Sequence, residues 1–225
     1  TAQMLGITMA ENFQRPIFAR SLTEYWRRWH ISLGSWMRDY VFYPLALSRP
    51  FRALGSFARK HFRGMLSKIF ATSMATFVVY FVIGVWHGAN FRYLAFGLYN
   101  GVLITAALLL EPLFVRVREK LPLCWDGWLW HGVQMLRTGV IVFIGRYITR
   151  APRLTTALSM LRRSVTDFSL SQLRGGALFS LGMTKADWLV VLAGLFVLLA
   201  VEVYQERGGR ARALLARQKP AVQGL

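Results

Sequence analysis

Long apolar runs, separated by basic and glycine-bearing connections, set the hydrophobic pattern of this sequence. A helix that crosses a bilayer needs about 20 mainly apolar residues, and several runs approach that length. They cover residues 69–86, 93–110, 131–147 and 188–204. The third run is the weakest, because Gly132, Arg137 and Gly139 interrupt it. The pattern predicts an all-α fold, a polytopic transmembrane helical bundle.

Charged and proline-bearing stretches mark where these runs are expected to end. We expect the second run to stop at Glu111 and Pro112. The charged residues 116–126, which include Pro122, predict a loop. Residues 164–185 are polar and glycine-bearing, and predict a second connection.

A tryptophan-rich segment precedes the first apolar run. Ser21 or Thr23 is suited to cap a helix that carries Glu24 in its first turn. At helical spacing, four large apolar side chains would share one face of this segment. They are Trp26, Trp29, Leu33 and Trp36. Because tryptophan prefers the headgroup level of a membrane, the segment is interpreted as an interfacial helix.

Two other segments are amphipathic and basic. Residues 49–68 contain six Lys or Arg side chains and no acidic one, which is typical of a segment lying on an anionic cytoplasmic leaflet. Residues 150–163 carry leucines on one side and arginines on the other.

Basic residues beside the apolar runs predict the orientation of the chain. The tail after Tyr204 and residues 49–68 are both strongly positive, so both are expected on the cytoplasmic side. Residues 146–185 are also basic, yet they would lie outside if every run crossed once. We therefore expect at least one segment to be re-entrant or to lie in the interface.

Composition supports the membrane reading. Hydrophobic residues make up 55% of the chain, against roughly 45–50% apolar residues in soluble domains. The formal charge of +18 fits either nucleic acid or an anionic membrane surface. The basic residues cluster beside apolar runs, which favours the membrane, and a nucleic-acid function would depend on the pI of 11.3 alone. The single cysteine, Cys124, excludes an intrachain disulfide framework and a cysteine-rich metal site.

The strongest chemical signal is a histidine between two apolar runs, in the stretch GVWHGAN at residues 84–90. An ionisable group at a membrane boundary is costly and is a functional candidate by default. The alternative is a helix-end histidine bonded to a backbone carbonyl. Of the four histidines, His30 and His87 each follow a tryptophan near a predicted boundary. His61 lies in the basic segment and His131 begins the third run.

The residue types around His87 favour a general base over other site chemistries. A metal site needs three or four ligands, and no carboxylate or thiol recurs at ligand spacing nearby. No Gly-x-Ser-x-Gly elbow occurs. A neutral imidazole, with a usual pKa of about 6.5, can accept a proton from a hydroxyl. Gly84 and Gly88 would allow a substrate or helix to approach, and the Asn90 amide could orient the ring or hold a carbonyl oxygen.

Two motifs carry a resemblance to a known family. The first is EYWRRWHISL at residues 24–33, followed by WMRDY at 36–40. The second is VWHGAN at residues 85–90, followed by GLYNG at 97–101. From about residue 12 to residue 161 the sequence resembles the membrane-bound O-acyltransferase family. The similar branch contains alginate O-acetylases and the D-alanyl transfer protein of teichoic acid synthesis.

The resemblance implies a multi-span bundle that encloses a tunnel and forms part of the larger fold of that family. His87 matches the essential histidine of the family, and His30 matches the second histidine of the tryptophan-rich motif. Other residues of the motifs are expected to contribute to substrate binding. They are Trp29, Arg38, Asp39, Trp86 and Asn90. For Arg38 and Asp39, a structural ion pair at the interface is the alternative.

The resemblance also implies the reactants and the setting. An acyl thioester on the cytoplasmic side, either acetyl-CoA or an acyl carrier protein, would donate to a cell-envelope glycan outside, with no bound cofactor. The expected acyl group is acetyl, with D-alanyl transfer to teichoic acid as one alternative and a non-catalytic acyl or substrate transport subunit as another. We expect a multi-pass protein of the plasma membrane, surrounded by lipids and accompanied by an extracytoplasmic acyltransferase.

Thr1 and the absence of a signal peptide lead us to expect the C-terminal part of a longer membrane domain that includes all of residues 1–225. Four parts are predicted within it. Residues 1–68 hold interfacial helices and the basic segment, 69–147 the candidate spans with the histidine motif, 148–187 an amphipathic segment and loop, and 188–225 the last span and basic tail.

Overall fold

The computed structural model describes residues 5–121, 125–169, 171, 179 and 182–209, and these residues form helices without a named strand. Contacts divide the chain into two units, residues 1–165 and residues 166–225. Each unit is described by itself. The all-α prediction is confirmed, whereas the prediction of one membrane domain stays a prediction.

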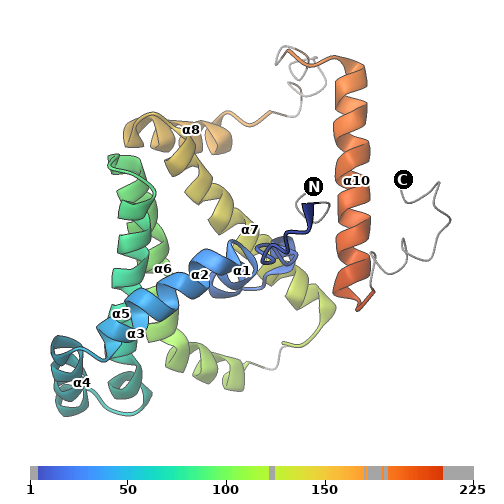
Figure 1. Cartoon of the computed structure of the whole chain (residues 1–225). Coiled ribbons are helices and arrows are strands. Elements are labelled where there is room, and N and C mark those ends of the chain that lie inside the picture. The colour runs from blue at the N-terminus through green and yellow to red at the C-terminus, as the bar shows by residue number, and fades with distance from the viewer. Residues whose placement is uncertain (1–4, 122–124, 170, 172–178, 180–181, 210–225) are drawn as a thin grey trace. The chain divides into compact units, whose positions relative to one another are not determined.

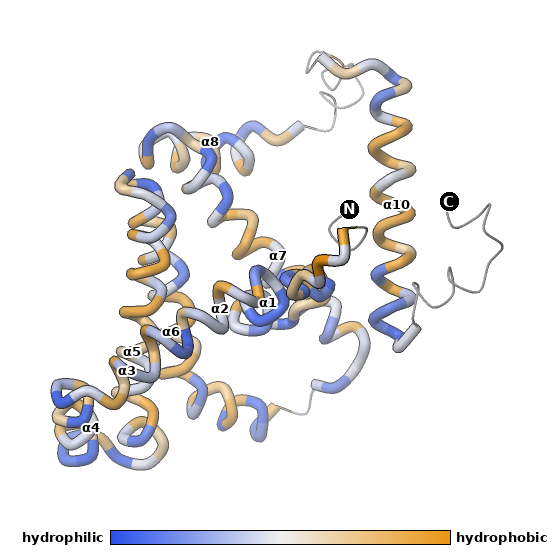
Figure 2. The backbone as a smooth tube through the Cα atoms, viewed as in Figure 1, coloured by the Kyte–Doolittle hydropathy of each residue, from blue (hydrophilic) through white to orange (hydrophobic). Residues whose placement is uncertain are grey.

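A hairpin of two long helices is the centre of the first unit (Figure 1). The hairpin consists of α5, Met65–Trp86, and α6, Phe91–Lys120. Figure 2 shows that hydrophobic positions predominate along the hairpin, although both helices also carry polar residues. The two helices touch backbone to backbone at Gly84 and Gly97, where a Cβ on Gly97 would lie 2.6 Å from the Tyr80 carbonyl oxygen. Glycine at a crossing lets two apolar helices approach closely, so this pair sets where the turn with His87 lies.

The tryptophan-rich segment is not one helix. It begins as α1, Leu22–Arg28, capped by Ser21, whose hydroxyl accepts a hydrogen bond from the Glu24 amide as predicted. The chain then becomes extended at Trp29 and left-handed at His30 before α2, Ile31–Met37. The prediction of one continuous apolar face was therefore wrong. Figure 1 shows α1 and α2 crossing in front of the hairpin and α7.

Short helices connect this segment to the hairpin. A π-helical turn, η3, covers Arg38–Phe42, and α3 covers Tyr43–Ala46. The basic helix α4, Arg49–His61, packs against α5. Its predicted range was too long, because the chain turns at Gly64 and residues 65–68 already belong to α5.

Three further elements belong to the first unit: the short 3₁₀ turn η2, Pro16–Phe18, and the helices α7, Trp128–Arg150, and α8, Leu154–Thr166. The last residue of α8 lies one position past the boundary between the two units, which follows residue 165. In the second unit, α10 covers Lys185–Glu206 and begins with a capping box between Thr184 and Asp187. The predicted connection at 164–185 lies largely outside the described residues.

Three of the described helices are long and apolar enough to cross a membrane, namely α5, α6 and α10. The third apolar run, 131–147, forms α7, but α7 is not among the described helices that are apolar enough to cross a membrane. The predicted end of the second run at Pro112 was wrong as a helix end, because α6 continues through this proline to Lys120. Proline removes only one backbone hydrogen bond, and the residues after it remain helical. The predicted loop at 116–126 is thus helical up to residue 120. The predictions of re-entrant segments and of orientation stay predictions.

Candidate active site

A cavity of about 470 Å³ lies among α1, α2, α5, α6 and α7. Both predicted catalytic histidines, His30 and His87, line it. Among the residues that the structure describes, three arginines and no carboxylate line the cavity; the arginines are Arg27, Arg38 and Arg146. The cavity therefore combines two imidazoles with a positively charged lining, although the segments that carry the histidines lie 57 positions apart in the sequence (87 minus 30).

His30 sits at a strained point of the backbone. Its φ and ψ angles are 54° and 51°, in the left-handed region, which residues with a Cβ adopt at a cost of about 1–3 kcal/mol. Its Nδ1 atom is buried without a hydrogen-bond partner. An isolated bridge pairs Phe13 with Trp29, and the Ile31 amide donates to the Asn12 carbonyl oxygen at 3.1 Å. The chain on both sides of His30 is thus fixed, and the strained residue, which lines the cavity, carries a buried ring nitrogen without a hydrogen-bond partner.

His87 follows the last residue of α5 and begins the turn to α6. Its ring lies 4.9 Å from the Trp86 ring, 6.1 Å from the Tyr93 ring and 6.4 Å from the Phe96 ring, centroid to centroid. These rings cover part of an otherwise exposed residue. This partial burial lowers the pKa of His87, and the nearby His30 lowers it further. Both effects favour the neutral imidazole, the form that accepts a proton.

The turn after His87 depends on glycine. Gly88 has a φ of +144°, and a Cβ there would meet the Tyr93 ring at 3.2 Å. The expected close approach at Gly84 and Gly88 is thus made by α6 itself.

Arg146 of α7 lines the cavity and contacts the Trp29 side chain. Its guanidinium carbon lies 5.1 Å from the centre of the Trp29 ring, and Trp29 stacks on Tyr25 at 5.8 Å with an angle of 12° between the planes. Burial raises the pKa of Tyr25, and a hydrogen bond from Arg146 opposes this effect. A cation–π contact of this kind contributes about 0.5–2 kcal/mol and holds the residue that precedes His30.

A buried amide joins α1 to α6 on the same wall. Asn100 is 2% exposed. Its Oδ1 atom accepts a hydrogen bond from the Trp26 indole at 3.1 Å, and its Nδ2 atom donates to the Phe96 carbonyl oxygen at 2.9 Å. Both ends of this amide are therefore used within the protein.

The predicted substrate-binding residues divide between the cavity and its surroundings. Trp29 and Arg38 line the cavity. Arg38 forms the anticipated ion pair with Asp39, at 2.9 Å between Nε and Oδ1. Asp39, Trp86 and Asn90 lie outside the lining, and the Asn90 side chain caps α6 by accepting from the Arg92 amide at 3.1 Å. The role of these residues in substrate binding stays a prediction.

Several residues of the cavity were not predicted from the sequence as site residues. They are Trp26, Arg27, Tyr80, Asn100 and Arg146. Asn100 lay within the motif GLYNG, so the motif itself could have indicated it. Arg146 offered no comparable signal, because one basic residue in an apolar run is equally suited to reach a headgroup.

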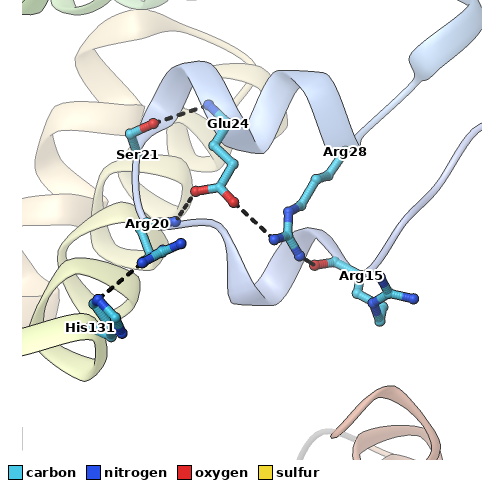
Figure 3. A network of polar contacts seen from close by, with 6 residues as sticks. All are labelled: Arg15, Arg20, Ser21, Glu24, Arg28 and His131. Atoms are coloured by element: carbon cyan, nitrogen blue, oxygen red, sulfur yellow. Dashed lines mark hydrogen bonds and ion pairs between the residues drawn. The ribbon is translucent and has the colours of Figure 1, made fainter. Parts of the chain in front are cut away.

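A second polar network ties α1 to α7 outside the cavity (Figure 3). Glu24 accepts hydrogen bonds from the Arg20 amide and from the Arg28 side chain, each at 2.8 Å. The Arg20 guanidinium in turn lies 3.0 Å from the His131 Nε2 atom. Arg137 donates to the Arg20 carbonyl oxygen at 2.8 Å. His131 thus belongs to this network and does not line the cavity.

Comparison of the sequence with those of known proteins identifies homologues of this chain. No protein-family model matches the chain. A protein named "Probable alginate O-acetylase AlgI" from Pseudomonas putida is 31% identical over 180 residues, which are 79% of this chain and 31% of that protein. The protein of the same name from Pseudomonas syringae pv. tomato is 29% identical over 93% of this chain and 36% of its own length.

The teichoic acid D-alanyltransferase of Bacillus subtilis is 32% identical over 45% of this chain and 23% of that protein. The chain therefore spans about a third of the length of the two alginate O-acetylases, which match it at 31% and 36% of their lengths. These similarities confirm the family indicated by the two motifs. The chain is a homologue of both groups of proteins, which are membrane-bound O-acyltransferases.

Proposed function

We propose that this chain carries the histidine site of a membrane-bound O-acyltransferase that acetylates hydroxyl groups of a cell-envelope polysaccharide. The observation that supports the proposal most directly is that His30 and His87 line one cavity. The names of the homologues support acyl transfer as the class of reaction.

His87 is the general base of this proposal. Its neutral imidazole accepts the proton of a glycan hydroxyl while that oxygen attacks the carbonyl carbon of an acetyl thioester. The tetrahedral intermediate then collapses, the carbon–sulfur bond breaks, and the thiolate leaves and takes up the proton from His87. The products are an acetyl ester and a free thiol. A positioned base of this kind contributes about 10²–10⁴-fold to the rate.

His30 is the second polar group of the mechanism. His30 lines the cavity together with His87, and its imidazole can bond to the donor or to the oxygen that becomes negative in the intermediate. The donor is acetyl-CoA or an acetylated carrier protein reaching the site from the cytoplasm. No resident cofactor is needed for these steps.

Transfer of D-alanine to teichoic acid is the second candidate. It is favoured by the 32% identity with the Bacillus subtilis teichoic acid D-alanyltransferase over 45% of this chain. The alginate O-acetylases match 79% and 93% of the chain, and this broader match favours acetyl transfer. In either case the protein acts as a multi-pass protein of the plasma membrane and works with an extracytoplasmic acyltransferase.

Reconstitution of the full-length protein in proteoliposomes tests the proposal. Acetyl-CoA or acetylated carrier protein, labelled in the acetyl group, is supplied on one side, and an envelope glycan on the other. We expect label on the glycan hydroxyls with the wild type, and a loss of about 100-fold or more with His87→Gln. The matched control is His61→Gln, because His61 is exposed on α4, stacks on Phe57 and does not line the cavity.

Each other outcome overturns the proposal in a different way. Full activity of the His87→Gln protein would exclude His87 as the base. Transfer of labelled D-alanine in place of acetyl would select the second candidate. Passage of the label across the membrane without an ester product would identify a transport subunit.

A further inference from the structure

The amide of Asn100 connects the two histidine-bearing segments through side chains of the cavity wall. Asn100 lies on α6 one turn after Phe96, and its Nδ2 atom is held by the Phe96 carbonyl oxygen at 2.9 Å. This bond leaves the Oδ1 atom facing the Trp26 indole N–H at 3.1 Å. Asn100 is 2% exposed, and leaving a buried polar group without its partner is expensive.

The indole held by Asn100 packs against the wall beside His87. The Trp26 and Phe96 rings meet edge to face, 6.1 Å apart at 77°. Phe96 also contacts His87, 6.4 Å away at 80°. One aromatic ring thus contacts both the indole that Asn100 holds and the proposed base.

The same indole fixes the other histidine. Trp26 is on α1, which ends at Arg28, and His30 follows in its strained conformation two residues later. The backbone between Trp26 and His30 is too short to absorb a sliding movement of α1. The position of His30 relative to His87 therefore depends on where Trp26 is held on α6.

We infer that Asn100 is a positioning residue, which sets the register between the tryptophan-rich segment and the His87 hairpin through its hydrogen bond to Trp26. The role in catalysis rests on the proposed acyl transfer, whereas the register itself does not. Misplacing catalytic groups by about 1 Å can cost about 100-fold in rate, so loss of this bond is expected to lower kcat more than it changes KM.

A double-mutant cycle tests the inference in the full-length, reconstituted protein. Trp26→Phe keeps an aromatic ring but removes the donor, and Asn100→Leu keeps the approximate volume but removes the acceptor. We expect each variant to lose about 100-fold in kcat, and the double variant to lose little more than either single variant, because all three lack the same bond. Trp36→Phe is the matched control, since Trp36 is 50% exposed and does not line the cavity, and it should match the wild type.

A chemical readout separates this inference from the proposed function. Diethyl pyrocarbonate modifies accessible neutral imidazoles, and mass spectrometry measures the rate at His30 and at His87. In the wild type the Nδ1 atom of His30 is buried. We therefore expect faster modification of His30 in Trp26→Phe and an unchanged rate in Trp36→Phe. This result holds even if the wild type transfers no acyl group, an outcome that would refute only the proposed function.

Three results would overturn the positioning role. The first is wild-type kcat and unchanged His30 modification in Trp26→Phe. The second is a loss confined to Asn100→Leu, which would mean that Asn100 acts on the substrate directly. The third is losses that multiply in the double variant, which would mean that Trp26 and Asn100 act independently.

Discussion

The crossing of α5 and α6 gives the sharpest structural prediction, because Gly97 contacts backbone atoms and not flexible side chains. The change Gly97→Ala would place a Cβ 2.6 Å from the Tyr80 carbonyl oxygen and 2.8 Å from the Gly84 Cα atom. Ordinary contacts of a Cβ begin near 3.4 Å. The two helices must therefore separate locally by about 0.8 Å, the difference between 3.4 and 2.6 Å, or the pair must rotate.

The size of the effect follows from packing at this crossing. Inserting a methyl group into a close-packed contact typically costs about 1–3 kcal/mol, and the alanine gains at most about 1 kcal/mol of helix propensity over glycine. The contact is with backbone atoms, so we take the upper end of the packing cost, about 3 kcal/mol. Subtracting about 1 kcal/mol of helix propensity gives an expected net loss of about 2 kcal/mol in the free energy of unfolding. The shift should also lower acyl transfer, because His87 lies three residues after Gly84.

Thermal unfolding of the full-length protein in detergent measures this effect. The matched control is Gly139→Ala, on α7, where an added Cβ meets no atom within 4 Å, so this variant should be as stable as the wild type or slightly more stable. A Gly97→Ala protein with wild-type stability would refute the reasoning, since the described backbone contact would then impose no cost.

Two further predictions concern the helix cap and the pH response. Ser21→Ala removes the acceptor for the Glu24 amide and should cost about 1 kcal/mol in the free energy of unfolding. Ser21→Asp, whose side chain also caps helices, should retain the wild-type melting temperature. Equal losses in both variants would contradict the capping role. The lowered pKa of His87 predicts that its carbethoxylation, which requires the neutral ring, persists below the usual value of about 6.5 and falls only at lower pH. His30→Gln should move that midpoint upward, because it removes a group that disfavours the charged ring; a wild-type midpoint above about 6.5 would contradict the assignment.

The long helices could be predicted from the sequence because their signal is local. The apolar runs at 69–86, 93–110 and 188–204 lie within α5, α6 and α10. Ser21 was likewise recognisable as a cap, because capping depends on residues a few positions apart. Both histidines of the cavity were found from their tryptophan neighbours and from the family motifs.

What escaped prediction depends on tertiary contacts. A left-handed His30 cannot be read from composition, because residues with a Cβ rarely adopt that conformation unless their surroundings impose it. Arg146 approaches Trp29 from α7, 117 positions away (146 minus 29), and no periodicity of either segment indicates this. Asn100 and Trp26 meet for the same reason, through the packing of separate helices.

The length of α6 has a consequence for how this hairpin sits in lipid. At 1.5 Å per residue, its 30 residues extend about 45 Å, whereas the hydrocarbon layer is about 30 Å thick. Counting from Phe91, that thickness is exhausted after about 20 residues, close to Pro112. The carbonyl group of Leu108, which loses its usual partner to the proline, thus lies in the last turn before that depth. Beyond that depth the last turns of α6 carry Arg116, Arg118 and Lys120, whose charged ends suit the headgroup level and not the hydrocarbon. The turn with His87 precedes the first residue of α6, so the hairpin carries its histidine and these cations at opposite ends of this helix.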